Sequence, residues 1–385
     1  MIGMKVYDLQ WFTVYGMNFD RAAEALCQDG VDTVLTQNFI DPLPSSGVDQ
    51  SVYRARFGSR LETYSDLAWH RALKAAGLRV IQTTATFFDP AALIQFPDAR
   101  PINALGEPDH GFDWYTGVCP TSEEYLVWKI DRMRRVVEEL QPDGYFLQFT
   151  RFPGFWENWT WNPHYVFSLE DQWCFCDRCR GLFSSATGIG LPGVSVGSDA
   201  SIILAEHRET WVRWRSGVLK SIIDNLAEAS GARTHGLQIM LNTLPFPRSD
   251  FGGLDVRRTI CGQDLALLSD SIDCFELMTY LQILKRPVSW IDAVVTDAIL
   301  QVPTGTKLVC TLQVNPLYTS GVHAGRARTR ESSADQLWES ASTAFHAGAD
   351  GLVFYHWTDF LEDEASGGTK RQMLREITSR MERPA

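Results

Sequence analysis

Residues 143–153 read Asp-Gly-Tyr-Phe-Leu-Gln-Phe-Thr-Arg-Phe-Pro, an apolar run that ends in polar side chains. A short apolar run bounded by turn residues is typical of a buried β-strand. An aromatic-rich loop follows it and leads into Cys174-Phe-Cys-Asp-Arg-Cys179. The stretch therefore predicts a strand, then rings that could form a substrate wall, and then three candidate metal ligands.

Similar apolar runs recur about eight times, and most are followed by a helical pattern. The clearest helix is expected over 121–140, where Thr121 and Glu124 form a capping-box pattern. Eight β-then-α units predict an α/β fold, a (β/α)8 TIM barrel with 1–385 as a single domain. An open doubly wound sheet is the alternative, but no Gly-rich turn follows the first predicted strand. The predicted strands cover 5–14, 31–39, 79–88, 143–152, 237–244, 272–280, 307–314 and 351–357.

The longest predicted loops follow strands 2, 3, 4 and 5. In a barrel these loops lie on the C-terminal face, where active sites are built. The Gly/Ser-rich segment 184–198 is expected to be a flexible excursion from this face.

The composition limits the partners of the chain. Its net charge is −12 and no Lys/Arg-rich run occurs, which argues against nucleic-acid binding. No segment has the length of a membrane span and no secretory signal is seen, so we expect a cytoplasmic protein without a membrane partner. These features are also compatible with a homo-oligomer. Several of the 13 Trp lie in predicted loops, where their rings could stack on sugars; burial in the core is the alternative.

The cysteines Cys174, Cys176 and Cys179 are close enough in sequence to converge on one tetrahedral ion. Cys119 lies at the end of the strand 3 loop, beside the strand 4 loop in a barrel, and can supply a fourth ligand. Four protein ligands leave no open position, so we expect a structural Zn²⁺ that joins the two loops. Unligated thiols, or a disulfide formed on oxidation, are the alternatives.

At this point the chain resembles the family 42 glycoside hydrolases, microbial β-galactosidases built on a barrel. Their zinc is held by one Cys from the strand 3 loop and a C-x-C-x-x-C after strand 4, the positions of Cys119 and Cys174–Cys179 here. The resemblance implies a glycosidase-like barrel and the same four zinc ligands.

Other strands resemble a broader group of barrel glycoside hydrolases. Asp143-Gly144 and Arg151-Phe152-Pro153 match the fourth strand of that group, and 114–121 resembles the segment that precedes it. The run 273–280 is similar to the Met-x-Tyr strand of family 18 chitinases. The run 354–360 is similar to a final strand in which a Trp floors the sugar site. These likenesses imply a carbohydrate substrate.

Three positions depart from these patterns. Gln148 stands where the group usually carries Asp, and Thr150 stands where family 18 carries its catalytic Glu. The seventh strand ends in Gln313-Val-Asn315, where family 42 places its nucleophilic Glu. The Asn-Glu pair that supplies the family 42 acid is also missing from strand 4. No complete carboxylate pair is therefore carried over from a resembling family.

Glycoside hydrolysis ordinarily uses two carboxyl groups, and three candidates follow from the residues. Glu276 shares a strand face with Met278 and Tyr280 and is expected to point into the barrel; a core Glu bonded to Gln148 or Arg151 is the alternative. Glu157, among Trp residues, would have a raised pKa suited to a general acid unless it is simply exposed. Asp359, after strand 8, is a candidate base or sugar ligand, or a helix cap.

Asp8, in the first strand, is a further carboxylate candidate, although a structural ion pair would also explain it. Arg151 could bind the carboxylate of a sugar acid or hold Glu276 in place. Amides and rings at predicted strand ends suit a polyhydroxylated ligand, although barrel interiors also contain polar layers. The residues expected to bind substrate are Trp11, Asn38, Gln148, Arg151, Trp156, Asn242, Tyr280, Gln313, His356 and Trp357.

Together these features predict a glycosidase that cleaves a small carbohydrate or glycoside by carboxylate acid/base catalysis. The missing acids leave two alternatives: a catalytically inactive carbohydrate-binding barrel, and a lyase or isomerase acting on a sugar derivative.

Overall fold

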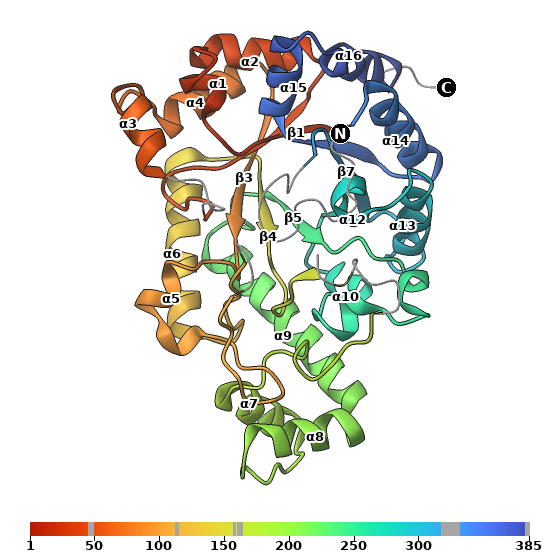
Figure 1. The fold of residues 1–385 in the computed structure, drawn as a ribbon. Helices are drawn as coiled ribbons and strands as arrows, with labels where there is room; N and C mark the ends of the chain where they lie inside the picture. The colour runs from red at the N-terminus through yellow and green to blue at the C-terminus, as the bar shows by residue number, and fades with distance from the viewer. Residues whose placement is uncertain (45–49, 112–114, 157–158, 160–164, 317–331, 382–385) are drawn as a thin grey trace.

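The computed structural model describes residues 1–385 except 45–49, 112–114, 157–158, 160–164, 317–331 and 382–385. Its centre is a closed barrel of parallel strands in sequence order (Figure 1). The first strand pairs with the second and also with the last, Ile2 opposite Leu352, which closes the ring. The predicted (β/α)8 barrel is confirmed. The strands are β1 Ile2–Val6, β2 Thr33–Thr36, β3 Arg79–Ala85, β4 Gly144–Gln148, β5 Gln238–Thr243, β6 Cys274–Thr279, β7 Lys307–Gln313 and β8 Gly351–Tyr355.

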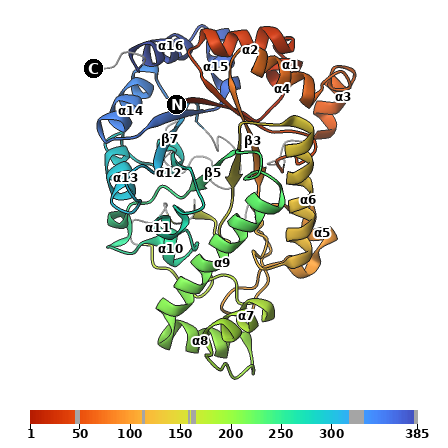
Figure 2. The same cartoon turned by 180° about the vertical axis from the view of Figure 1, so that it is seen from behind.

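Long helices surround the strands, as Figures 1 and 2 show from opposite sides. None of the described helices has the length and apolarity that a bilayer crossing requires. The outer helices are α2 Phe19–Gln28, α4 Asp66–Ala75, α6 Glu123–Leu140, α9 Arg208–Ala229, α13 Trp290–Ile299, α14 Ala334–His346 and α16 Lys370–Met381. The other helices are α1 Gln10–Thr13, α3 Gln50–Leu61, α5 Ala92–Gln95, α7 Asp177–Thr187, α8 Val196–Glu206, α10 Val256–Thr259, α11 Leu265–Leu268, α12 Leu281–Leu284 and α15 Trp357–Ala365.

Several predicted boundaries differ from the structure. The first strand ends at Val6, because the chain turns into α1 at Gln10. The segment 184–198 is not simply a flexible loop, since it contains the end of α7 and the start of α8. These two helices contact α9 and stand apart from the strands at the lower end of Figure 1.

The predicted capping box at Thr121 and Glu124 is wrong. Helix α6 begins at Glu123, and its N-cap Ser122 makes no side-chain capping bond. The Thr121 hydroxyl instead lies 3.3 Å from Cys119 Sγ and 3.2 Å from Cys179 Sγ. The cysteine cluster therefore uses the hydroxyl that the sequence pattern assigned to the helix.

Alternate residues of the strands fill the barrel in layers. One apolar residue from each of β2 to β8 forms the lowest layer. In β1 the matching residue is Gly3, where a Cβ would lie only 2.9 Å from Val353 Cγ2. Two residues further along the strands the interior becomes polar, and this change positions the site described below. The apolar layer consists of Leu35, Ile81, Phe146, Met240, Cys274, Val309 and Val353.

Helices α2 and α16 both lie at the upper end of Figure 1. A buried ion pair connects α16 to Asp29, the residue that follows α2. Asp29, which is fully buried, accepts hydrogen bonds from Arg371 Nε at 2.8 and 3.0 Å and from Arg375 Nε at 2.9 Å. The next residue, Gly30, has φ +76°, and a Cβ there would lie 2.2 Å from Thr378 Oγ1. This close approach requires glycine for both its conformation and its missing side chain.

The substitution Asp29→Asn tests how much this ion pair contributes to stability. Because it removes the buried counterion that Arg371 and Arg375 share, we expect the free energy of unfolding to fall by about 3–5 kcal/mol in urea denaturation. Glu364→Gln is the matched control, since Glu364 pairs with Arg371 from a half-exposed position. Its expected loss is below about 1 kcal/mol. Equal losses in the two variants would contradict the assignment.

Candidate functional site

The polar layer of the barrel is centred on a buried ion pair between Lys5 of β1 and Glu276 of β6. Lys5 Nζ lies 2.9 Å from Glu276 Oε1, and the two side chains are 2% and 0% exposed. Asn242 Nδ2 and Thr311 Oγ1 also donate to the Glu276 carboxylate. Glu276 thus points inward, as predicted. Its partners come from three other strands, and they are not the predicted Gln148 or Arg151.

Aromatic rings surround the Lys5 ammonium. Its Nζ lies 5.2–5.8 Å from the centroids of four rings, those of Tyr7, Phe146, Tyr280 and Tyr355. It also donates to the Tyr280 hydroxyl at 3.2 Å. Burial lowers the pKa of Lys5, an effect that Glu276 opposes, and burial raises the pKa of Tyr7.

The mouth of the barrel lies directly above this layer. Gln148 Nε2 donates to the Tyr7 hydroxyl at 2.6 Å, so β4 and β1 meet across the opening. Gln313, which is half-buried, donates to Gln282 Oε1 at 2.9 Å. The mouth therefore presents amide and phenol groups, the donor and acceptor types that bind hydroxyls.

A second polar group occupies the ends of β1 and β8. His356 lies between two carboxylates: its Nε2 is 3.6 Å from Asp8 Oδ2, and its Nδ1 is 3.6 Å from Asp359 Oδ2. Thr358 donates to Asp8 Oδ1 at 2.7 Å, and Asn315 donates to Asp359 Oδ1 at 3.3 Å. Burial raises the pKa of Asp359, whereas the adjacent His356 lowers it. Asp359 Oδ2 also accepts from the His356 backbone N–H at 3.2 Å, so Asp359 caps α15, as the alternative interpretation expected, and is at the same time half of a carboxylate pair at the mouth.

Some of the predicted site residues lie at the mouth of the barrel or in the layer beneath it, and the others lie elsewhere. Trp11 of α1 and Trp357 of α15 are fully buried, with their rings 6.0 Å apart where the two helices meet, so neither ring is open to a ligand. Asn38 donates to Gln82 at 3.0 Å, and Trp156 packs edge-on against Phe246. Glu157 lies outside the described residues. The mouth or the layer beneath it contains Gln148, Asn242, Glu276, Tyr280, Gln313, His356 and Asp359.

Arg151 follows β4 at the same end of the barrel. Phe149 has φ 53° and turns the chain between Gln148 and Arg151. The Arg151 guanidinium carbon lies 5.2 Å from the Phe149 ring and 5.8 Å from the Tyr115 ring. The side chain is only 1% exposed and does not reach Glu276.

The four predicted metal ligands are brought together. The Sγ atoms of Cys119, Cys174, Cys176 and Cys179 all lie within 4.8 Å of one another. Cys119 Sγ is 3.7 Å from Cys176 Sγ and 3.6 Å from Cys179 Sγ. A tetrahedral ion with metal–sulfur bonds of 2.3 Å requires sulfurs about 3.8 Å apart, so this cluster could bind a metal.

The cysteine cluster connects the loop after β3 with the loop after β4, which are distant from each other in sequence. Ile102 N donates to Cys174 Sγ at 3.4 Å, and Phe175 N donates to Ile102 O at 2.7 Å. Arg215 of α9 then connects this region to the strand 5 loop, donating to Trp173 O at 2.7 Å and to Ile260 O at 3.0 Å. The loops after β3, β4 and β5 are thereby held as one wall.

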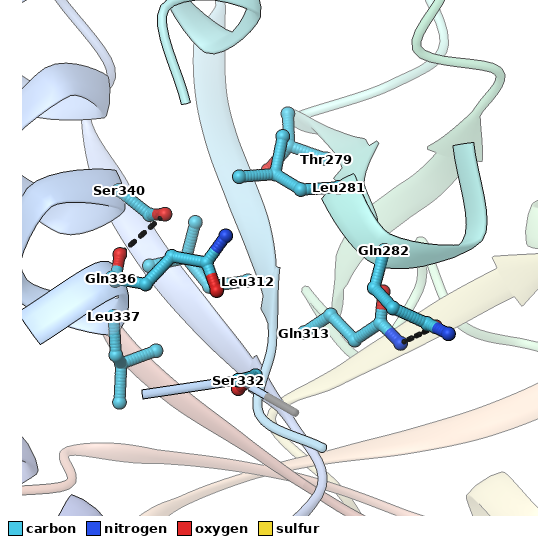
Figure 3. Close-up of a pocket in the computed structure, with 9 residues that line it drawn as sticks. All are labelled: Thr279, Leu281, Gln282, Leu312, Gln313, Ser332, Gln336, Leu337 and Ser340. Atoms are coloured by element: carbon cyan, nitrogen blue, oxygen red, sulfur yellow. Dashed lines mark hydrogen bonds between the residues drawn. The ribbon is translucent and has the colours of Figure 1, made fainter. Parts of the chain in front are cut away.

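A small cavity lies outside the mouth, between the ends of β6 and β7 and helix α14 (Figure 3). The space open to the centre of a water molecule is about 20 Å³, enough for about one water. It is too small for a sugar. Its lining comprises Thr279, Leu281, Gln282, Leu312, Gln313, Ser332, Gln336, Leu337 and Ser340.

Lys5 is the residue of this site that sequence reasoning missed. Its signal is a single cation inside the apolar run Ile2–Val6, on the strand face that also carries Tyr7. A lysine inside a buried strand requires a partner, which the inward Glu276 supplies.

Glu276→Gln tests the buried pair. Since Lys5 would be left buried without its counterion and would either hold an uncompensated charge or release its proton at a cost, we expect the free energy of unfolding in urea to be about 3–5 kcal/mol lower than for the parent. The double variant Lys5→Met, Glu276→Leu removes both charges and should recover most of that loss. A single variant as stable as the parent would show that the pair does not stabilise the barrel.

Comparison with known proteins supports the fold. No family model and no curated protein matches the sequence. Among solved structures, the PgaB (BpsB) glycoside hydrolase domain from Bordetella bronchiseptica is 15% identical with a TM-score of 0.68, and the match covers 98% of each chain. The catalytic domain of β-amylase from Paenibacillus polymyxa is 12% identical with a TM-score of 0.63, and the match covers 100% of this chain and 99% of that one.

Gan42B, a GH42 β-galactosidase from G. stearothermophilus, is 14% identical with a TM-score of 0.59. The match covers 98% of this chain but only 57% of that chain. At these identities the similarity establishes the fold: the chain has a glycoside-hydrolase-like (β/α)8 barrel, and it carries a four-cysteine cluster.

Proposed function

We propose that this protein is a glycosidase that hydrolyses a small carbohydrate or glycoside at the C-terminal mouth of its barrel. The observation that carries the proposal is the pair of carboxylates, Asp8 and Asp359, on either side of His356 at this mouth. The amide and phenol groups beside them suit a sugar, and the fold resembles those of glycoside hydrolases.

The two carboxylates have different surroundings, which suits different roles. Burial favours the protonated form of Asp359, so Asp359 is assigned the proton donation to the departing glycosidic oxygen. Asp8 is more exposed. It is assigned the stabilisation of the positive charge that develops on the sugar, and it accepts the proton of the water that then attacks the anomeric carbon. Glu157 remains the second predicted acid. Glu276, held by Lys5, is assigned to support the site from below, and full turnover by a folded Glu276→Gln variant would show that catalysis does not need this support.

A sugar-binding barrel without turnover is the second candidate. The observation that favours it is the amide or hydroxyl at Gln148, Thr150 and Gln313, where resembling enzymes carry acids. Calorimetry measures sugar binding and a product assay measures hydrolysis, so the two together separate the two functions. Binding without any product would favour the second. A lyase would instead release an unsaturated sugar, which absorbs in the ultraviolet.

Asp359→Asn is expected to lower turnover on a glycoside panel at least about 100-fold, because the proton donor is lost. The same variant should unfold at a higher temperature than the parent at pH 7. A raised pKa means that the contribution of Asp359 to stability is present below pH ~3.9 and is lost as the pH rises through the folded-state value. The stability difference should therefore shrink towards pH 3.

Glu228→Gln, at an exposed position of α9, is the control and should change neither activity nor stability. Full activity of Asp359→Asn would exclude Asp359 as the acid.

We further propose that the four-cysteine cluster binds a structural Zn²⁺. The sulfur spacing fits a tetrahedral ion, and four thiolates would leave no position for substrate. Its contribution would be to hold the loops after β3 and β4 together. Such a site is compatible with a reducing compartment, and we propose the cytoplasm.

Metal analysis of the purified protein should give about one zinc per chain, and Cys176→Ser should reduce this amount strongly. Loss of the ion should also lower the unfolding temperature, because two loops lose their connection. Cys27→Ser is the control, since Cys27 is not part of the four-cysteine cluster and its thiol donates to Ala76 O. A parent protein without zinc when it is purified under reducing conditions would contradict the proposal.

A further inference from the structure

Arg151 differs from the other buried arginines of the described chain. Arg257 and Arg371 are paired with Asp297 and Asp29, and Arg215 donates to backbone carbonyls. Arg151 is 1% exposed, and its Nε has no hydrogen-bond partner. Among the residues that the structure describes, no carboxylate lies within ion-pair distance of this guanidinium.

A bare cation in this position is unfavourable. Arginine stays protonated in proteins, so Arg151 cannot relieve its burial by losing a proton. A buried charge is costly unless it is paired, and rings at 5.2 and 5.8 Å compensate only in part. Lys5, the other buried cation at this end of the barrel, is already neutralised by Glu276. Arg151 is therefore the cation here that lacks a described counterion.

The surroundings of Arg151 suit a sugar ring that carries an acid. Phe149 is only half-buried and stacks with Tyr115, their centroids 6.1 Å apart, which gives an aromatic platform beside the guanidinium. Gln148, three residues before Arg151, already lies in the mouth. A guanidinium matches planar carboxylates and other oxyanions through parallel hydrogen bonds. Because the chain carries a net charge of −12, an anionic ligand needs such a local cation.

We propose that Arg151 binds an anionic substituent, a carboxylate or a sulfate ester, on the sugar that occupies the mouth. This inference rests on the proposed function and narrows its substrate class from carbohydrates to acidic carbohydrates. The guanidinium has no carboxylate partner among the described residues, and the acidic group of the substrate would supply one.

The test is calorimetry with matched pairs of ligands. The pairs are 4-nitrophenyl β-D-glucuronide against the β-D-glucoside, and 4-nitrophenyl β-D-galactoside 6-sulfate against the unsulfated β-D-galactoside. The parent should bind at least one anionic member about tenfold or more tightly than its neutral partner. Whether the carboxylate or the sulfate gives the larger ratio identifies the acidic group. In Arg151→Met the ratio should fall to about one, and Arg151→Lys should recover it only partly.

Thermal unfolding supplies the readout that separates recognition from structure. Arg151→Met removes a buried, unpaired charge, so the unliganded variant should be at least as stable as the parent. Arg135→Met, on the exposed face of α6, is the control and should keep the parent's affinity ratio. Equal binding of anionic and neutral members by the parent, or a much less stable Arg151→Met, would overturn this inference alone. Failure to bind any sugar would overturn the proposed function with it.

Discussion

The neutralisation of Lys5 by Glu276 is the constraint on which the upper half of the barrel depends. Below the pair the interior is apolar, and above it the strands end in amides, phenols and acids. The pair, with Asn242 and Thr311, joins strands that are far apart around the ring. Removing one charge would leave the other uncompensated between these two regions. The ion pair therefore holds in place the rings that surround Lys5, and one of these rings, Tyr7, bonds to Gln148 at the mouth.

Two sides of this mouth are built differently. On one side, the four cysteines and Arg215 hold the loops after β3, β4 and β5 together. On the other side, Asp8 and His356 meet because β1 and β8 pair to close the barrel. The chemistry proposed here therefore uses residues from the first and last strands, while the opposite wall presents Arg151 and its aromatic neighbours.

Much of this arrangement could be predicted from local patterns. The alternation of side chains placed Glu276 inside. The spacing of three cysteines grouped them, and the neighbouring loops of a barrel added Cys119 from a distant part of the sequence. Contacts across the barrel could not be predicted, since a strand pattern gives the face of a residue but not the side chain it meets. Lys5 was missed for this reason. Trp11 and Trp357 illustrate another limit, because an aromatic ring has the same local signature in a core as in a sugar site.

The closing of the ring also affects how the protein is made. Strand β1 emerges from the ribosome first, yet one of its edges must wait for Gly351–Tyr355. At typical synthesis rates that wait is on the order of tens of seconds. During this time the β8-facing edge of β1 and the cation on Lys5 have no native partner. Sequence separation of this kind slows folding, and it makes the growing barrel prone to aggregation.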